Sequence, residues 1–477
     1  MTTDAEARVL NSATPAIPVA AVASWAWALG VGALTAAVYT WYSAWQWTHY
    51  AVKSWDLGIF TELFQRYAAW QAPIVDIKGP GFNLLGDHFH PLLVVFTPVF
   101  ALFPHAFTLL VIQNLCFGAA AAILTRTARR LLGPVLGVAL GCAFGLSWGL
   151  QYAVDAQFHE IALAVPLLTA SLCALLERRW AWAIGCAALL VFVKEDLGWT
   201  VAVIAALIAI RARNPRALWL AVWGVGWFAI ATFVVLPALN PGHSYGYNDA
   251  FAPLAALSST TFWTLAPPVC VLLIACTGGL MLRSPIAFAV LPTLAWRTTV
   301  DSPNYWGLEW HYNAVLMPVA FAALIDGALL LRRSPRRWLH GFGRWAPWVA
   351  SGLAAASLVV NIPSSAFTGH LPLLSAVIQS APNPRAAAAG AAVAAIPDGA
   401  TVETDIGLMS YVVDDHLTYF IENANPAPGC ILLDRVAGHD PVSWAGVLDA
   451  AERLHPGIPY VIRYHDAGYQ LACRSVH

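Results

Sequence analysis

The ionisable residues of this 477-residue chain form two groups that alternate along the sequence. Arginine clusters follow one set of apolar stretches, whereas lysines, acids and histidines occupy the connections between them. Carboxylates and imidazoles act as acids, bases and metal ligands, and ammonium groups bind phosphate. We therefore expect the chemistry in the second group. Its candidate residues are Asp56, Lys78, Asp87, His88, His159, Glu160, Lys194, Glu195, Asp196, His311 and Tyr312.

Asp56 stands at the start of a predicted helix, in the segment Trp55-Asp56-Leu57-Gly58. One aspartate at such a position commonly caps the helix. The alternative is a general base, or a metal ligand, at the mouth of a cavity. The sequence leaves both interpretations open.

The run Asp87-His88-Phe89-His90 places one carboxylate and two imidazoles within four residues. Such groups suit a divalent ion, such as Mg²⁺ or Mn²⁺, and Asp56, Asp87 and His88 are its candidate ligands. No spacing typical of a metal motif is present, so helix capping and ordinary loop hydrogen bonds are the alternative.

Lys194-Glu195-Asp196 interrupts a long apolar stretch, and charged groups at membrane depth usually have a function. Lys194 and Arg297 are candidates for binding a phosphate or diphosphate, as a point charge and as a bidentate fork respectively. For the lysine, an ion pair that merely holds two helices together is the alternative. His159-Glu160 also fits the start of a helix. His311-Tyr312 could bind a sugar hydroxyl or anchor the membrane interface.

The composition indicates a polytopic membrane protein. Hydrophobic residues make up 59% of the chain, charged residues 11%, and the mean hydropathy is +0.64. Apolar stretches recur throughout the chain, which excludes an enzyme with a single anchor. A net charge of −1 without a basic patch excludes a nucleic-acid partner. No nucleotide-binding motif is present, so an activated donor should be lipid-borne or arrive from outside.

We expect an all-α fold of about eleven transmembrane helices. A cytoplasmic tail, 1–18, precedes a transmembrane domain, 19–361, and arginine clusters mark the cytoplasmic ends of its helices. A long first outer loop, 46–105, should hold an amphipathic helix, Asp56–Trp70, and an interfacial helix, Pro91–Phe103. The predicted spans are 19–45, 106–124, 132–150, 160–176, 180–194, 197–210, 217–238, 262–282, 285–297, 311–331 and 345–361.

Two of these spans are too short to cross the membrane completely. The fifteen residues of the span 180–194 rise only about 22 Å, less than the roughly 30 Å hydrocarbon core. The span that ends at Arg297 is similarly short. Together they predict a polar cavity that opens to the outer side, with charged residues lining it.

The composition changes after the last span. Residues 382–477 alternate short apolar runs with Pro, Asp and Gly turns, which predicts a small α/β domain. With the amino terminus in the cytoplasm and an odd number of spans, this domain lies outside the cytoplasm. Cys430 and Cys473 are therefore candidates for a disulfide.

The motifs Trp55-Asp56-Leu57-Gly58, Gly86-Asp87-His88-Phe89, Phe158-His159-Glu160, Lys194-Glu195-Asp196 and His311-Tyr312 resemble the bacterial family called domain of unknown function 2079. The expected architecture resembles the GT-C superfamily of membrane glycosyltransferases. That resemblance implies sugar transfer from a polyprenyl-phosphate carrier outside the cytoplasm. It also implies that Asp56, the acid after the first span, is the base or a metal ligand.

We therefore expect an inverting glycosyltransferase of the inner or plasma membrane. Its partners would be the lipid bilayer, a polyprenyl-phosphate sugar and a cell-envelope acceptor: a glycan, lipid or protein. The alternatives are a transporter or lipid flippase for an envelope precursor, and a non-catalytic envelope assembly protein. A flippase would need polar groups that continue to the cytoplasmic face, and the inner halves of the spans are almost uniformly apolar, with Asp326 as the main exception.

Overall fold

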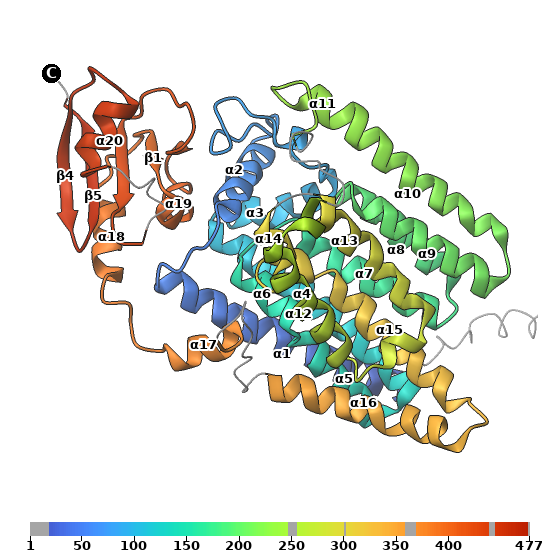
Figure 1. The fold of residues 1–477 in the computed structure, drawn as a ribbon. Helices are drawn as coiled ribbons and strands as arrows, with labels where there is room; N and C mark the ends of the chain where they lie inside the picture. Colours follow the sequence, from blue (N-terminus) through green and yellow to red (C-terminus); the bar gives the residue numbers. More distant parts are fainter. Residues whose placement is uncertain (1–18, 247–254, 300–301, 358–368, 438–443, 476–477) are drawn as a thin grey trace, which may run out of the picture.

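The computed structural model describes residues 19–246, 255–299, 302–357, 369–437 and 444–475. The chain forms a large helical region and a smaller carboxy-terminal domain beside it (Figure 1). The predicted cytoplasmic tail, 1–18, lies outside the described residues.

Five helices form the centre of the helical region, where α4 contacts α1, α5, α7 and α15. Glycine and proline residues set some of the helix ends. Gly133, with φ +109°, ends α4, and the following Pro134 is the first residue of α5. The helices are α1 (Val19–Thr48), α4 (Ala106–Leu132), α5 (Pro134–Gly145), α6 (Trp148–Asp155), α7 (Ile161–Leu176), α8 (Trp180–Leu189), α9 (Leu197–Ala212), α10 (Trp219–Ile230), α11 (Leu236–Leu239), α12 (Thr260–Ala275), α13 (Leu291–Trp296), α14 (Pro303–Trp306), α15 (Leu316–Arg332) and α16 (Arg337–Ser357).

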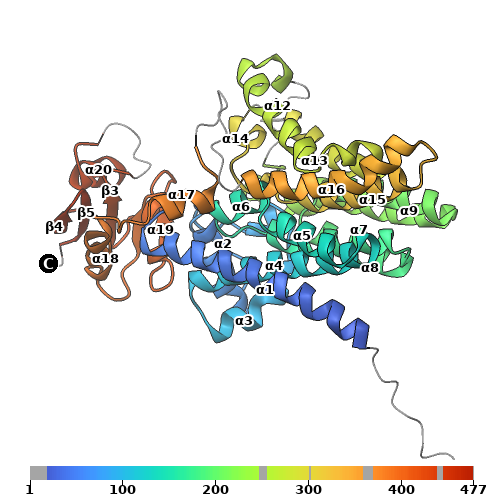
Figure 2. The same cartoon turned by 90° about the horizontal axis from the view of Figure 1, so that it is seen from below.

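Helices α8, α9 and α10 pack side by side at one flank of this centre (Figure 1), whereas α16 crosses α5 and α15 at another (Figure 2). The predicted hairpin of two short helices is present as α8 and α9. A 3₁₀ turn, η4 (Leu190–Phe192), and the Lys194-Glu195-Asp196 tip connect them. Between α10 and α11 lies a π-helical turn, η6 (Ala231–Val235).

The eleven predicted spans are not confirmed. Within the described ranges, three helices are long and apolar enough to cross a bilayer: Ala106–Leu132, Pro134–Asp155 and Pro215–Leu239. A bent pair, Pro303–Asn313 with Leu316–Arg332, would be a fourth. Several other apolar helices have 10–17 residues, fewer than the roughly 20 that a span needs. The predicted span 285–297 is divided into η9 (Pro285–Val290), α13 and η10 (Arg297–Thr299).

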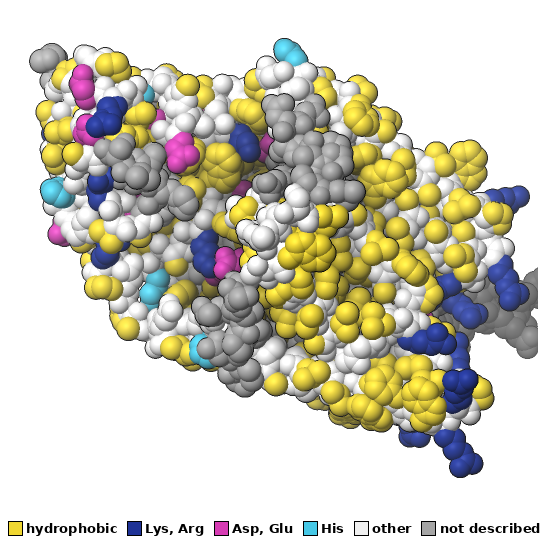
Figure 3. Space-filling view, in the orientation of Figure 1, with side chains coloured by type: hydrophobic (Ala, Val, Ile, Leu, Met, Phe, Trp, Pro, Cys, Tyr) yellow, Lys and Arg dark blue, Asp and Glu magenta, His cyan; other side chains and the backbone are white. Residues whose placement is uncertain are grey.

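Positive side chains gather at the end of the helical region farthest from the carboxy-terminal domain, next to a broad apolar surface (Figure 3). Arginines occupy the last turns of α4, α9 and α15. The arginines that predict the cytoplasmic face therefore lie at the carboxy-terminal ends of these three helices.

The first loop contains α2 (Asp56–Ala68), η2 (Leu84–Gly86), η3 (Pro91–Phe96) and α3 (Thr97–Leu102). Leu57 to Phe64 are all buried in α2, because α3, α4 and the carboxy-terminal domain cover the helix on several sides. In contrast, Leu102 and Phe103 at the end of α3 are 74% and 64% exposed. The segment Pro91–Phe103 thus has the apolar surface expected of an interfacial helix.

The carboxy-terminal domain is a five-stranded sheet with helices, in the strand order β2-β1-β3-β5-β4. β1 pairs with β2 and β3 in parallel, whereas β5 runs antiparallel to both β3 and β4. Its elements are α18 (Ala386–Ala394), β1 (Val402–Thr404), α19 (Ile406–Val412), β2 (Thr418–Phe420), β3 (Cys430–Asp434), α20 (Val447–Leu454), β4 (Tyr460–Asp466) and β5 (Tyr469–Arg474), and α17 (Pro372–Ile378) precedes them.

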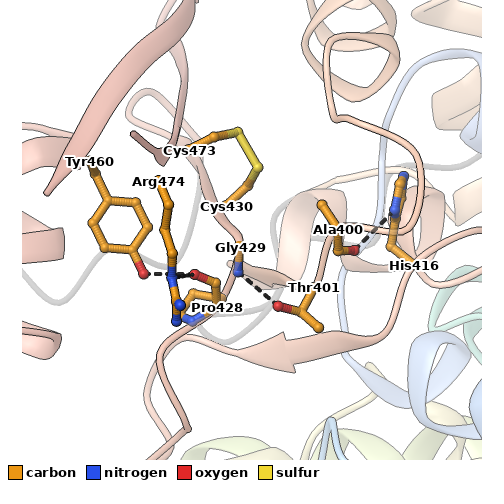
Figure 4. The surroundings of a disulfide bond; sticks show 9 residues. All are labelled: Ala400, Thr401, His416, Pro428, Gly429, Cys430, Tyr460, Cys473 and Arg474. Carbon is orange, nitrogen blue, oxygen red and sulfur yellow. Dashed lines mark hydrogen bonds between the residues drawn. A yellow bond between two sulfur atoms is a disulfide. The ribbon is translucent and has the colours of Figure 1, made fainter. Parts of the chain in front are cut away.

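A disulfide joins Cys430 and Cys473, which are directly opposite partners on β3 and β5 (Figure 4). Hydrogen bonds hold the chain beside it. The Tyr460 hydroxyl and the Arg474 Nε both donate to the Pro428 carbonyl, at 2.7 and 2.9 Å. The end of the sheet is therefore connected both covalently and by polar contacts.

Candidate active site

One cavity of about 1680 Å³ lies between the first loop, the α8–α9 tip and the segment before α15. It is lined by eleven of the twelve residues that the sequence singles out as catalytic or substrate-binding: Asp56, Lys78, Asp87, His88, His159, Glu160, Lys194, Glu195, Asp196, His311 and Tyr312. The chain has three lysines, and the third, Lys53, lines the cavity too. Residues from distant parts of the sequence thus form one polar wall.

Lys194 is the centre of one buried network. Its Nζ lies 2.9 Å from the Glu160 Oε1, and the Glu160 Oε2 lies 2.7 Å from the His159 Nδ1. Glu160 is fully buried, and Lys194 is 8% exposed. The network joins the start of α7 to the α8–α9 tip. The buried Glu160 carboxylate needs such positive partners nearby, because an unpaired buried charge is costly.

A second network joins the first loop to the same tip. The His88 Nδ1 lies 3.0 Å from the Glu195 Oε1, and the Phe89 backbone N–H donates to the Glu195 Oε2 at 2.9 Å. Nearby, the Lys78 Nζ lies 2.9 Å from the Asp87 Oδ2 and over the Trp55 ring. Burial raises the pKa of the Asp87 carboxyl, but the charges of Lys78 and His88 outweigh burial and hold that pKa below its ordinary value.

Asp56 is the first residue of α2, and Trp55 occupies the capping position. The helix-cap interpretation of Asp56 is therefore wrong. The Ser54 hydroxyl donates to the Asp56 Oδ2 at 2.6 Å, which fixes the carboxylate at the cavity wall. Potential ligand atoms of Asp56, His159 and His311 all lie within 4.8 Å of one another. The sequence predicts a different metal set, in which Asp87 and His88 accompany Asp56.

Arg297 is the one predicted site residue that does not line the cavity. Its buried guanidinium donates to the Asn313 Oδ1 at 2.9 Å and to the Tyr312 carbonyl at 2.6 Å. The Asn313 amide donates in turn to the carbonyls of Gly307 and Leu308. Arg297 therefore holds the loop that presents His311 and Tyr312, and this placement does not support the predicted phosphate contact.

Apart from Tyr312, the aromatic residues of the wall are not among the candidates from the sequence. Trp296, Tyr305 and Tyr312 contact one another edge to face. Trp310 lines the cavity and has φ +70°, which is unusual for a residue other than glycine. The dense aromatic run between 296 and 312 is the signal in the sequence that could have indicated this wall.

The other half of the cavity is apolar. One face of α9 contributes Trp199, Val203, Ala206 and Ile210, which follow helical spacing from the charged tip toward the opposite end of the helix. Facing them are residues from α10, η6, η9 and α13: Phe228, Phe233, Phe288, Leu291, Pro292 and Ala295. Several of these side chains are largely exposed, including Ile210 at 74% and Phe233 at 72%. The polar wall and the apolar wall thus belong to one continuous space.

The carboxy-terminal domain reaches this cavity through Ile406, at the start of α19. Met409 of the same helix and Val413, which follows it, share a core with Leu57 and Phe60 of α2. The domain is therefore part of the structure that holds Asp56 in place.

Comparisons with known proteins address both family and fold. The model of a family described as a predicted membrane protein, DUF2079, matches residues 49–421. Two similar solved structures are crystal structures of ArnT from Cupriavidus metallidurans, bound to undecaprenyl phosphate and in the apo state. They share 13% and 14% identity with this chain, and both have a TM-score of 0.51. The matches cover 92% and 94% of this chain and 97% and 98% of those chains. No curated protein matches the chain. The structural matches show that the chain has a fold similar to that of ArnT.

Proposed function

Because the chain belongs to the DUF2079 family of predicted membrane proteins and its cavity joins a charged wall to an apolar groove, we propose that it is a membrane glycosyltransferase. It transfers a sugar from a polyprenyl-phosphate donor to an extracytoplasmic acceptor of the cell envelope. The acceptor is a hydroxyl group of a glycan, lipid or protein.

The main support for this proposal is that a charged wall and an apolar groove line the same cavity. A polyprenyl phosphate has the same two parts: a charged head next to the sugar and a long hydrocarbon chain. The α9 face from Trp199 to Ile210 is about 16 Å long, at 1.5 Å per residue. It can hold several isoprene units while the head group remains beside Lys194 and Lys78.

The exposed side chains of the groove support entry of the donor from the bilayer. Ile210, Phe233 and Phe288 line the cavity and are largely exposed. A lipid can therefore enter sideways without leaving hydrocarbon. The structure of ArnT with undecaprenyl phosphate supports the view that this fold accommodates such a lipid.

The polar wall has the groups that sugar transfer needs. The acceptor oxygen attacks the anomeric carbon as the bond from that carbon to the phosphate oxygen breaks, which inverts the configuration. Asp56 activates the acceptor hydroxyl, as a general base or as a metal ligand. Lys194 and Lys78 stabilise the negative charge on the departing polyprenyl phosphate.

A transport path is less well supported by the same cavity. Beyond Asp196, the wall on α9 is apolar as far as Ile210. The polar contact at the other end of this helix, between Arg211 and Asp326, involves no cavity-lining residue. A charged head group would therefore meet no charged residue on α9 between Asp196 and Arg211.

The test is sugar transfer by the full chain in lipid nanodiscs, supplied with a panel of polyprenyl-phosphate sugars and cell-envelope extract as acceptor. We expect release of polyprenyl phosphate by the wild type and a fall of about 10²-fold or more in Asp56→Asn. Asp398→Asn, in an exposed turn of the carboxy-terminal domain, is the matched control and should retain activity. Full transfer by Asp56→Asn would refute the assigned role of Asp56, and no turnover of any donor by the wild type would refute the function.

A further inference from the structure

Two histidines and one aspartate converge on the polar wall from three separate elements. Asp56 begins α2, His159 lies two residues before α7, and His311 begins the 3₁₀ turn η11 (His311–Asn313). One ligand atom of each lies within 4.8 Å of the other two, and all three residues line the cavity. Zn²⁺ binds nitrogen and oxygen ligands at about 2.0–2.2 Å, so small side-chain rotations suffice to close this set around one ion.

His311 lacks protein partners for both of its ring nitrogens. The residue is 4% exposed, and neither Nδ1 nor Nε2 has a hydrogen bond within the described part of the chain. A buried imidazole normally has a hydrogen-bonding partner or binds a metal. Its ring lies against that of His159, with centroids 3.4 Å apart and planes inclined by 19°, so the two imidazoles border the same space.

The other two side chains are already oriented by neighbours that leave a ligand atom free. The His159 Nδ1 contacts the Glu160 Oε2, which leaves its Nε2 for a metal. The Asp56 Oδ2 accepts the Ser54 hydroxyl, which leaves its Oδ1. Metal-binding histidines commonly have a carboxylate on the second ring nitrogen, because this contact fixes the ring and strengthens the ligand.

The charge of the cavity wall also favours a bound cation. Three lysines and the positively charged His88 face five carboxylates, those of Asp56, Asp87, Glu160, Glu195 and Asp196. The wall therefore has an excess of negative charge before an anionic donor enters. A divalent ion offsets that excess, and it lies where a phosphate would otherwise meet carboxylates.

We propose that Asp56, His159 and His311 bind one divalent transition-metal ion, for which Zn²⁺ is the best match, with an open coordination position toward the cavity. Two imidazoles and one carboxylate suit Zn²⁺ better than Mg²⁺, which prefers oxygen ligands. Asp87 and His88 do not join this set, because Lys78 and Glu195 engage them. Metal binding is independent of the proposed function, whereas a role of the ion in sugar transfer rests on it.

The test uses the purified full chain after treatment with a chelator and adds Zn²⁺ alone. We expect one tightly bound Zn²⁺ per chain, measured by elemental analysis and by calorimetric titration, and a rise in melting temperature with Zn²⁺. His311→Ala and His159→Ala should each weaken binding at least about 100-fold, since each removes a ligand. His465→Ala, on the exposed strand β4, is the control and should bind as the wild type does.

Co²⁺ provides a second measurement, because its visible absorption reports nitrogen and oxygen ligands directly. The wild type should give this absorption, and His311→Ala should lose it while it keeps the melting temperature of the metal-free wild type. The inference is overturned if the wild type binds no Zn²⁺, or if both single variants retain one tightly bound ion.

Failure of this inference and failure of the proposed function give different results. If Zn²⁺ binds as expected but no sugar is transferred, the site is real and the function is wrong. If sugar transfer proceeds at full rate after chelation and no Zn²⁺ binds, the function holds and the metal site does not.

Discussion

Asp405 is a titratable residue of the carboxy-terminal domain, and it is buried. It follows β1 and caps the amino-terminal end of α19, and its carboxylate accepts hydrogen bonds from the backbone N–H groups of Gly407 and Asp434, at 3.0 and 2.6 Å. Burial raises the pKa of this carboxyl to about 7, despite the opposing effect of those bonds. One residue thus makes the stability of this domain depend on pH.

The direction of that dependence follows from proton linkage. An unfolded aspartate has a pKa of about 3.9, so the folded chain binds the proton more tightly. The stabilisation is complete below about pH 4 and is lost as the pH rises toward 7, with a total of a few kcal/mol. We expect Asp405→Asn to reduce the difference in unfolding free energy between pH 5 and pH 8. Denaturant titrations at both pH values measure it, and an unchanged difference would contradict the assignment to Asp405.

At the residue scale, most of the polar wall could be predicted from the sequence. Charged groups are costly in an apolar environment, so ionisable residues in an apolar chain usually have a function. The contacts between them could not be predicted. Asp56, His159 and His311 are far apart in the sequence, and each has a plausible local explanation. Arg297 shows the opposite problem: its charge suggested a phosphate ligand, but its partners are Asn313 and a backbone carbonyl.

At the scale of elements, two glycines determine how α9 and α10 meet. A Cβ on Gly224 would come within 2.5 Å of the Gly198 carbonyl oxygen and within 3.0 Å of Val201. In contrast, a Cβ on Gly226 of the same helix would have no atom within 4 Å. Small residues allow membrane helices to approach closely, and this contact fixes the helix that bears the apolar groove.

We expect Gly224→Val to destabilise the protein by about 1–3 kcal/mol, because the added methyl groups force α9 and α10 apart. Gly226→Val introduces the same side chain into the same helix and should have a much smaller effect. Melting temperatures in one detergent provide the comparison. Equal losses in the two variants would show that helix propensity, and not the contact with Gly198, is responsible.

Elements were predictable where periodicity or length made them distinct. The α8–α9 hairpin and α2 lie close to their predicted positions. The short elements α19, β2 and β5 were not predicted. α19 has only seven residues, and β2 has three, so tertiary pairing and not local pattern defines them. The predicted number of spans exceeded the helices of sufficient length because apolarity alone does not separate a span from a broken or half-length helix.

At the scale of the whole molecule, the carboxy-terminal domain and the first loop share one core. The Gln65 amide donates to the Val413 carbonyl, and the Ala106 backbone N–H donates to Asp414. Trp47 in α1 packs on Tyr411, whose hydroxyl donates to the Trp47 carbonyl. Changes within this domain should therefore reach the cavity.

The disulfide is the covalent part of that arrangement. The bond closes a loop with a sequence separation of 43, and in the chain-entropy model its loss costs about 4 kcal/mol. We expect the double variant Cys430→Ala/Cys473→Ala to be cleaved by protease within residues 382–477 at a lower temperature than the wild type. Cys270→Ala, an exposed free cysteine in α12, is the control. Identical cleavage profiles would show that non-covalent contacts suffice.

The confinement of every lysine to one wall has a practical consequence. Lys53, Lys78 and Lys194 are the only primary side-chain amines of the chain, and their exposed fractions fall steeply, with side-chain values of 49%, 19% and 10%. On most proteins an amine-directed reagent modifies lysines over the whole surface. On this chain it would modify only lysines of the cavity wall, to extents that follow their exposure. Mass spectrometry of the three lysine-containing peptides then measures whether the cavity is occupied, whatever molecule occupies it.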